Sequence, residues 1–151
     1  MKKYLYHGSP KKLSKLSSEK RGLFLSPLKG IASIFAIDEA KEFSKSKTFS
    51  FNMDYDEWRL PDPKLKNPLK SVHIRHNVPN TKKISGTSTG YIFTIDATNL
   101  KLEDFKDNPN SKRELVYFGP EIDYVSIEKI KINWTAEYSK DQENKYGQGS
   151  F

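Results

Sequence analysis

Two short runs near the start of the chain combine a predicted strand with residues suited to ligand contact. The apolar run 4–6 leads directly into His7, Gly8 and Ser9, and the run 22–25 leads into the pair 26–27, a serine and a proline. An imidazole forms hydrogen bonds at two nitrogens, and a glycine lets backbone amide and carbonyl groups come close to a ligand. We interpret the two strand ends as the floor of a binding cleft.

Three further side chains are candidates for the same cleft. Glu114 comes directly before the apolar run 115–118, so its carboxylate can point into a cleft or form a surface salt bridge. Phe24 and Phe35 are eleven residues apart, one on a predicted strand and the other on a predicted helix. Taken alone, both phenylalanines fit ordinary core packing, and His7 fits a structural hydrogen-bonding role.

The elements that must position these residues follow from periodicity and from turn residues. Ser26 and Pro27 predict the N-cap and first position of a helix, whose buried face would carry Leu28, Ile31, Ala32 and Phe35. A second cap at 38–39 predicts that this helix continues, or that a helix restarts, through about residue 43. Strands are predicted at 3–7, 22–25, 48–53, 91–95, 113–118 and 124–132. One surface helical turn is expected within 11–21, a hinge or turn at 85–90 and a short helical turn at 100–105.

The order of these elements predicts an α+β fold with split, mostly antiparallel β-sheets and flanking helices. Four prolines interrupt the stretch 54–83, which we expect to form a long loop with short strands or a lid. A single domain is expected over 1–136, followed by a polar tail at 137–151.

Composition narrows the classes of function. The 151 residues include no cysteine, which excludes a thiolate nucleophile, a disulfide framework and a cysteine zinc site. His73 and His76 have no carboxylate at ligand spacing, so no metal site is expected. Because no long apolar run is present, we expect no membrane span and a cytoplasmic location. The net charge of +7 fits either simple solubility or attraction to a polyanion.

Taken in order along the chain, these motifs resemble the ADP-ribosyltransferase superfamily. The similarity is to its His-Tyr-Glu class, shared by diphtheria-type toxins and the catalytic domains of poly(ADP-ribose) polymerases. It is carried by the run 6–9 (YHGS), the run 22–25 (GLFL), Phe35 and the run 113–117 (RELVY). The chain departs from the class at Phe24, where the first tyrosine would stand, and at Phe35, where a second tyrosine is usual.

The resemblance implies that NAD is the cofactor and substrate. Gly8 would offer its backbone to the nicotinamide carboxamide, His7 would bind a ribose hydroxyl and Ser9 would support this network. Phe24 and Phe35 would flank the nicotinamide ring. Glu114 would stabilise an oxocarbenium-like transition state, as carboxylates do in glycosidases. The ADP-ribose acceptor would be a macromolecule, protein or nucleic acid. The candidates for contacts to the pyrophosphate are basic residues near the cleft, namely Lys11, Lys12 and Arg21.

Three alternatives stay open at this point. The same scaffold can serve as a non-catalytic module that binds NAD, ADP-ribose or nucleic acid. It can also host RNA 2′-phosphotransfer, although Arg21 and Arg113 match the arginines of that branch only loosely. A basic protein of unrelated fold that binds nucleic acid by charge alone would place His7 and Glu114 far apart.

Overall fold

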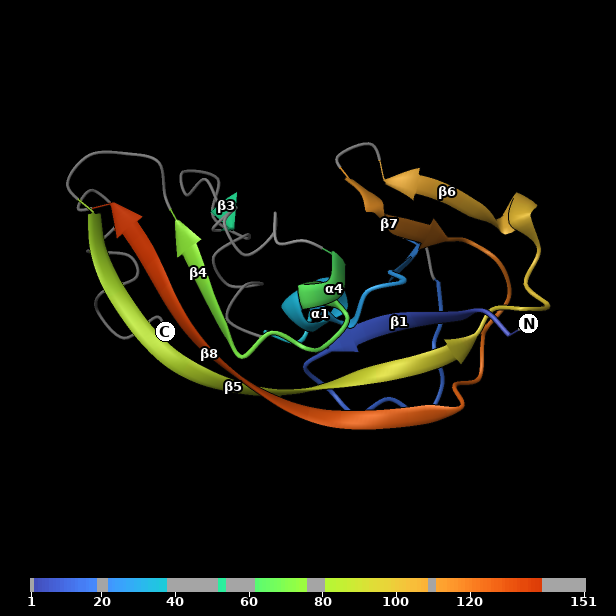
Figure 1. Cartoon of the computed structure of the whole chain (residues 1–151), viewed down its shortest axis with the longest axis horizontal. Coiled ribbons are helices and arrows are strands. Elements are labelled where there is room, and N and C mark those ends of the chain that lie inside the picture. Colours follow the sequence, from blue (N-terminus) through green and yellow to red (C-terminus); the bar gives the residue numbers. More distant parts are fainter. Residues whose placement is uncertain are drawn as a thin grey trace.

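The computed structural model describes residues 2–18, 22–37, 52–53, 62–75, 81–108 and 111–139. Within these ranges the protein is mostly β, with two sheets and short helices (Figure 1). The predicted split between two sheets is therefore confirmed. The predicted flanking helices are only short in the described residues, where α1 (Lys29–Ile34) has six residues and α4 (Asp62–Leu65) has four.

The larger sheet, here called the curled sheet, has the strand order β1-β5-β8-β4-β3. Its strands are β1 (Tyr4–Ser9), β5 (Thr81–Asp96), β8 (Ser126–Ser139), β4 (Ser71–Arg75) and β3 (Asn52–Met53). Only β4 and β8 pair in parallel among these neighbours. Figure 1 shows the two long strands, β5 and β8, bending into an arc with α1 inside the curve.

The second sheet, here called the small sheet, has the order β2-β7-β6 and is fully antiparallel. Its strands are β2 (Leu23–Leu25), β7 (Ser111–Tyr117) and β6 (Phe105–Asn108). A short 3₁₀ turn, η1 (Leu102–Asp104), leads into β6 and matches the helical turn predicted at 100–105. In Figure 1 the small sheet lies across the end of the curled sheet that contains β1.

Two apolar clusters hold these layers together. One packs α1 against the curled sheet, through Ile31 and Ile34 on the helix and Ile92, Ile132 and Trp134 on the strands. The other fills the space between the two sheets, with members that include Leu5, Leu25, Phe93, Ile95 and Tyr117. The second cluster fixes β1 relative to β2 and β7, which are the strands that carry the candidate site.

The predicted hinge at 85–90 is wrong, because these residues lie within the continuous strand β5. Their glycines serve close packing. A β-carbon on Gly86 would lie 2.4 Å from the Trp134 ring, and one on Gly90 would lie 2.5 Å from the β-carbon of Ala36. Glycine here lets an aromatic ring and a helix end approach the sheet.

Two further local predictions need correction. The helix predicted from Ser26 begins at Lys29, with Leu28 as its N-cap, and Ser26 Oγ accepts a hydrogen bond from the Leu28 amide at 3.0 Å. The surface helical turn predicted within 11–21 is absent from residues 11–18, where Leu16 forms a bridge to Ile122. Leu16 is fully buried, so this segment is held as a packed loop.

Other expectations agree with the structure where it describes them. Strands are present in the predicted regions at 3–7, 22–25, 91–95, 113–118 and 124–132. The last strand extends to Ser139, beyond the start predicted for the polar tail. The helix ends at Ile34 with Phe35 as its C-cap, so its predicted continuation is wrong over 35–37. The rest of that continuation, 38–43, most of the strand at 48–53 and much of 54–83 lie outside the described residues.

Candidate functional site

The candidate site lies where the two sheets meet. Tyr6 on β1 and Ser26 at the end of β2 form a single antiparallel bridge. The Tyr6 amide donates to the Ser26 carbonyl at 2.8 Å, and the Ser26 amide donates to the Tyr6 carbonyl at 2.9 Å. We call this place the β1–β2 junction, because all the predicted site residues lie on or next to the strands that it joins.

The direction of the Gly8 backbone follows from this bridge. Backbone polar groups alternate between the two edges of an antiparallel strand. The backbone amide and carbonyl of Tyr6 both form hydrogen bonds on the β2 side, whereas the Lys3 carbonyl accepts a hydrogen bond from the Ala97 amide on the β5 side. Gly8 is two residues after Tyr6 on β1, so its amide and carbonyl point in the same direction as those of Tyr6, toward β2. The two groups lie next to each other on this edge of the strand, two residues beyond the bridge.

His7 is held against β2 by its side chain. Its Nδ1 lies 2.8 Å from the carbonyl oxygen of Phe24. Since a carbonyl can only accept, Nδ1 carries the proton, and Nε2 carries the lone pair when the ring is neutral. The imidazole also lies against Phe93, with ring centroids 6.2 Å apart. These contacts fix the orientation of the His7 ring.

Gly8 is positioned by α1. A β-carbon at Gly8 would lie 1.7 Å from the carbonyl oxygen of Ala32, which is far inside contact distance. Any side chain would therefore push the helix away from β1. The close approach explains why glycine is needed at this position, and it places the end of α1 directly behind the Gly8 backbone.

Phe24 and Phe35 come together as the resemblance implied, but they contact each other. Their ring centroids are 5.7 Å apart and the planes differ by 11°, so the rings form an offset stack. A flat heterocycle between two parallel rings needs two contact gaps, about 7 Å in total. The slot expected for nicotinamide is therefore closed in this conformation, because stacked rings leave one contact gap, and the ring planes would have to separate by roughly another 3.5 Å.

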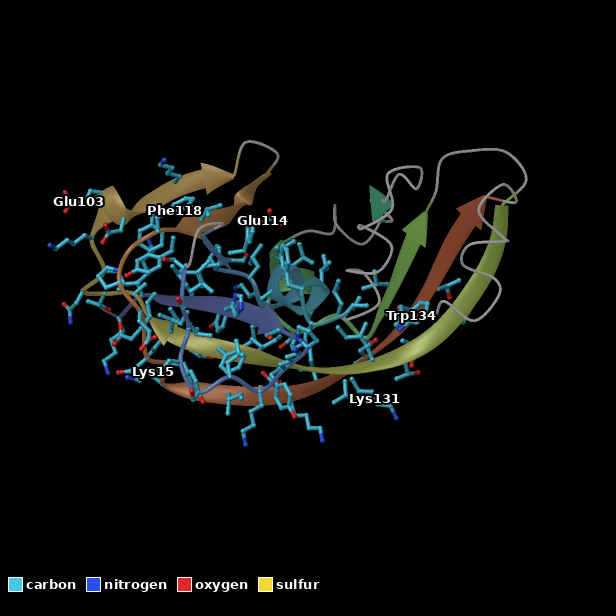
Figure 2. All side chains as sticks on the ribbon, turned by 180° about the vertical axis from the view of Figure 1, so that it is seen from behind. Lys15, Glu103, Glu114, Phe118, Lys131 and Trp134 are labelled. Carbon is cyan, nitrogen blue, oxygen red and sulfur yellow. The ribbon has the colours of Figure 1, made fainter. Side chains whose placement is uncertain are left out.

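Glu114 is placed beside the junction by strand pairing. Phe24 pairs with Val116 and Leu25 with Leu115, so Glu114 lies one residue farther along, level with Ser26. Alternation puts Glu114 on the same face as Val116 and the Phe24 ring. Its side chain is buried, at 5% exposure, and a glutamate this buried is held by polar partners in folded proteins. Figure 2 shows Glu114 at the end of the small sheet that faces α1.

The imidazole and the carboxylate thus approach β2 from different directions. His7 shares its face of β1 with Leu5, and its ring bonds the backbone of β2. Glu114 lies on the face of the small sheet that carries the Phe24 ring. At the level of Ser26, β1 and β7 are two strand spacings apart, roughly 10 Å between backbones. A ligand of dinucleotide size is long enough to reach both.

Ser9 has a structural role in the described contacts. It is buried, and its Oγ accepts a hydrogen bond from the Lys11 amide at 3.1 Å, which closes the turn after β1. The exposed residues Lys11 and Lys12 follow in this turn, and Arg21 lies outside the described residues. The predicted link between Ser9 and the ligand network stays a prediction.

The structure adds two residues to the junction. Ser26, expected as a helix N-cap, instead forms the bridge to Tyr6. The other residue, Lys29, was not singled out from the sequence. Lys29, in the first turn of α1, places its ammonium 5.5 Å from the centre of the Tyr6 ring and pairs with Glu128 at 3.2 Å. The sequence alone could not place Lys29 at the junction, because the position of its side chain depends on where the helix starts.

Two features are absent from the described residues. No three His, Cys, Asp or Glu side chains gather there as a metal site would need. Likewise, none of the helices in those ranges is long and apolar enough to cross a membrane. Finally, no family model, no curated protein and no solved structure matches the chain.

Proposed function

We propose that the protein is an NAD-dependent ADP-ribosyltransferase of the His-Tyr-Glu class, with NAD bound across the β1–β2 junction. The observation that carries the proposal is the edge of β1 at Gly8. A backbone donor and a backbone acceptor point there toward β2, beside a fixed imidazole and a pair of stacked aromatic rings. A primary carboxamide, such as that of nicotinamide, needs one donor and one acceptor side by side.

In this proposal the other residues act on the rest of the dinucleotide. Nε2 of neutral His7 accepts a hydrogen bond from a ribose hydroxyl, since Nδ1 is committed to Phe24. The nicotinamide ring enters by separating Phe24 from Phe35, or stacks on the outer face of one of them. Phenylalanine provides the π-face for stacking without a hydroxyl.

Glu114 is the proposed catalytic carboxylate. The bond that breaks joins C1′ of the ribose to the nicotinamide nitrogen, and the bonding electrons leave with neutral nicotinamide. The positive charge that develops on the ribose is stabilised by the Glu114 carboxylate, through the 2′-hydroxyl or directly. A nucleophile of the acceptor then bonds C1′ and loses its proton to solvent. A buried carboxylate provides stronger electrostatic stabilisation than an exposed one.

Transfer of label from NAD tests the acceptor side of this proposal. NAD labelled in its adenylate phosphate is incubated with the protein and a cell lysate, and macromolecules are then separated from free nucleotide. We expect label on protein or on nucleic acid, and digestion with protease or nuclease identifies which. Lys131→Gln, far from the junction on the outer face of β8, is the matched control and should transfer normally. Absence of transfer from every fraction would count against the transferase.

A second candidate function is supported by the direct stacking of the Phe24 ring on the Phe35 ring. Because Phe24 and Phe35 already contact each other, NAD or ADP-ribose can bind at the junction without adopting the geometry for bond cleavage. The chain would then be a non-catalytic binding module on the same scaffold. Saturable NAD binding measured by calorimetry, together with no release of nicotinamide, would support this second function over the first.

A further inference from the structure

A separate pocket opens at the other end of the seam between the two sheets. Its volume is about 570 Å³, within the usual size range for small-molecule sites. The pocket lies near the start of β1. Its lining residue Lys3 is four residues before His7 of the β1–β2 junction, so the two are separated by roughly 13 Å along an extended strand. The lining residues are Lys3, Leu5, Ala97, Thr98, Leu100, Leu102, Phe105 and Leu115.

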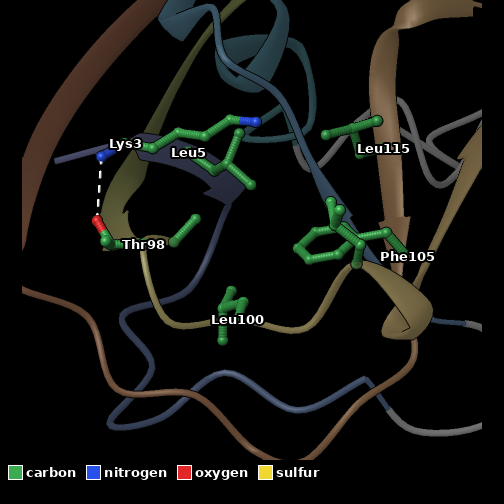
Figure 3. A pocket seen from close by; sticks show the side chains of 8 residues that line it. Lys3, Leu5, Thr98, Leu100, Phe105 and Leu115 are labelled. Atoms are coloured by element: carbon green, nitrogen blue, oxygen red, sulfur yellow. Dashed lines mark hydrogen bonds between the residues drawn. The ribbon is translucent and has the colours of Figure 1, made fainter. Parts of the chain in front are cut away.

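Most of the side chains that line this pocket are apolar, and the exceptions are Lys3 and Thr98. Figure 3 shows Leu5 on one wall, Phe105 and Leu115 on the opposite wall and Leu100 between them. Phe105, Leu115 and Leu100 are only partly buried, although they pack against the cluster between the sheets. Leu102, at 85% exposure, is the most exposed large apolar side chain of the described residues. The pocket therefore presents apolar surface to solvent, which a ligand with an apolar body would cover.

The polar groups of the pocket lie along one side. Thr98 Oγ1 accepts from the Lys3 amide at 3.1 Å and donates to Asp96 Oδ1 at 2.6 Å, so this hydroxyl is already used within the protein. The ammonium of Lys3 is the one charged group in the lining. Among the described residues, the ion pairs join Lys15 to Glu121 and Lys29 to Glu128, and neither involves Lys3.

We propose that this pocket binds a small amphiphilic monoanion, with an aliphatic or aryl body and one carboxylate. The body would lie among Leu5, Leu100 and Phe105, and the carboxylate would pair with the Lys3 ammonium at the rim. The lining offers one ammonium and one hydroxyl, fewer polar side chains than the phosphates, sugars and base of a nucleotide would need, so this ligand differs in class from the dinucleotide proposed for the junction. The two sites share no side chain, and each proposal can fail without the other.

Octanoate is a suitable probe, and octanol is its neutral counterpart. Binding is measured by calorimetry and by the shifts of leucine methyl signals in NMR spectra of the full chain. We expect saturable octanoate binding that moves the methyl signals of Leu5, Leu100 and Leu115. Lys3→Gln keeps the backbone bond to Thr98 and should weaken octanoate binding about fivefold, as loss of an exposed ion pair would. It should leave octanol binding unchanged.

A second pair of variants controls for folding. Leu102→Asp puts a negative charge at the rim of the pocket, on a side chain that is already exposed, and should weaken octanoate binding more than octanol binding. Val125→Asp makes the same change at another exposed apolar residue and should have no effect. Octanoate that binds Lys3→Gln or Leu102→Asp as well as the wild type, or shifts that appear elsewhere in the molecule, would overturn the proposal.

Discussion

His7 Nδ1 donates a hydrogen bond to the carbonyl oxygen of Phe24 over 2.8 Å, across the junction of the two sheets. The bond ties a side chain of β1 to the backbone of β2, in a place where the two strands otherwise share one bridge. It also fixes the neutral tautomer, because the protonated nitrogen must face the carbonyl. The imidazole therefore has a structural role whether or not a ligand also uses it.

Replacing His7 separates its structural role from its ligand role. His7→Ala should lower the free energy of unfolding by about 1–3 kcal/mol, since the Phe24 carbonyl loses its donor. His7→Asn can place an amide donor near the position of Nδ1 and should retain much of this stability. Urea denaturation measures both variants. The interpretation is wrong if Ala and Asn are equally stable, or if neither differs from the wild type.

Adding one methyl group at Gly8 should disrupt the packing of α1 on β1. Gly8→Ala places its β-carbon 1.7 Å from the Ala32 carbonyl oxygen, so helix and strand must move apart. We expect a loss of about 3 kcal/mol or more, at the upper end of overpacking effects. Ser14→Thr adds the same group at an exposed site and is the control. Equal thermal midpoints for the two variants would contradict the close contact.

The stack of Phe24 on Phe35 can be measured as a coupling energy. In a double-mutant cycle with Phe24→Leu and Phe35→Leu, the singles should be non-additive by about 0.5–1.5 kcal/mol. Leucine keeps most of the apolar volume, so the cycle reports mainly the ring pair. If the two losses simply add, the rings do not interact in solution. That outcome would mean that the slot is open without a ligand.

Much of the strand framework was recognisable from the sequence. The runs at 3–7, 22–25 and 113–118 are short, apolar and bounded by turn residues, and the matching β1, β2 and β7 carry the site. The resemblance implied that Phe24 and Phe35 flank one ligand ring, and the structure shows their rings stacked on each other. The sequence could not show whether the rings leave a gap, because that depends on how closely α1 approaches the strands.

The errors have physical causes. The stretch 85–90 contains two glycines and several hydroxyl residues, which is typical of a turn, yet Trp134 and Ala36 need those glycines inside a strand. The strand at Phe105–Asn108 is polar and lies at the edge of the small sheet, so it has no apolar pattern to detect. The helix start at Ser26 was wrong because Ser26 is used by the bridge to Tyr6.

Stability at acid pH should depend on Asp96. The Thr98 hydroxyl, and then the Thr98 amide, donate to its carboxylate and lower the pKa of Asp96 below its usual value of 3.8. Between the folded and unfolded pKa values, the unfolded state binds more protons, so stability rises with pH. The contribution of Asp96 is therefore complete above 3.8 and is lost as pH falls through the folded value.

Thr98→Val tests this link, because it removes the hydroxyl and keeps the amide. The pKa of Asp96 should rise toward 3.8, as read from NMR titration of the carboxyl carbon. The loss of stability on acidification should then begin at higher pH than in the wild type. Thr89→Val, at an exposed position on β5, is the control. An unchanged titration of Asp96 in Thr98→Val would mean that the hydroxyl bond does not hold in solution.

We propose that Glu114 assists cleavage of the bond between nicotinamide and ribose at the β1–β2 junction. The most direct measurement is the rate of nicotinamide release from NAD, followed by chromatography, for the wild type and for Glu114→Gln, with circular dichroism to verify that both are folded. We predict release by the wild type and a loss of about 10²-fold or more in Glu114→Gln, as for other groups that stabilise developing charge. Equal rates in the two proteins, or no release by the folded wild type, would contradict the proposed activity.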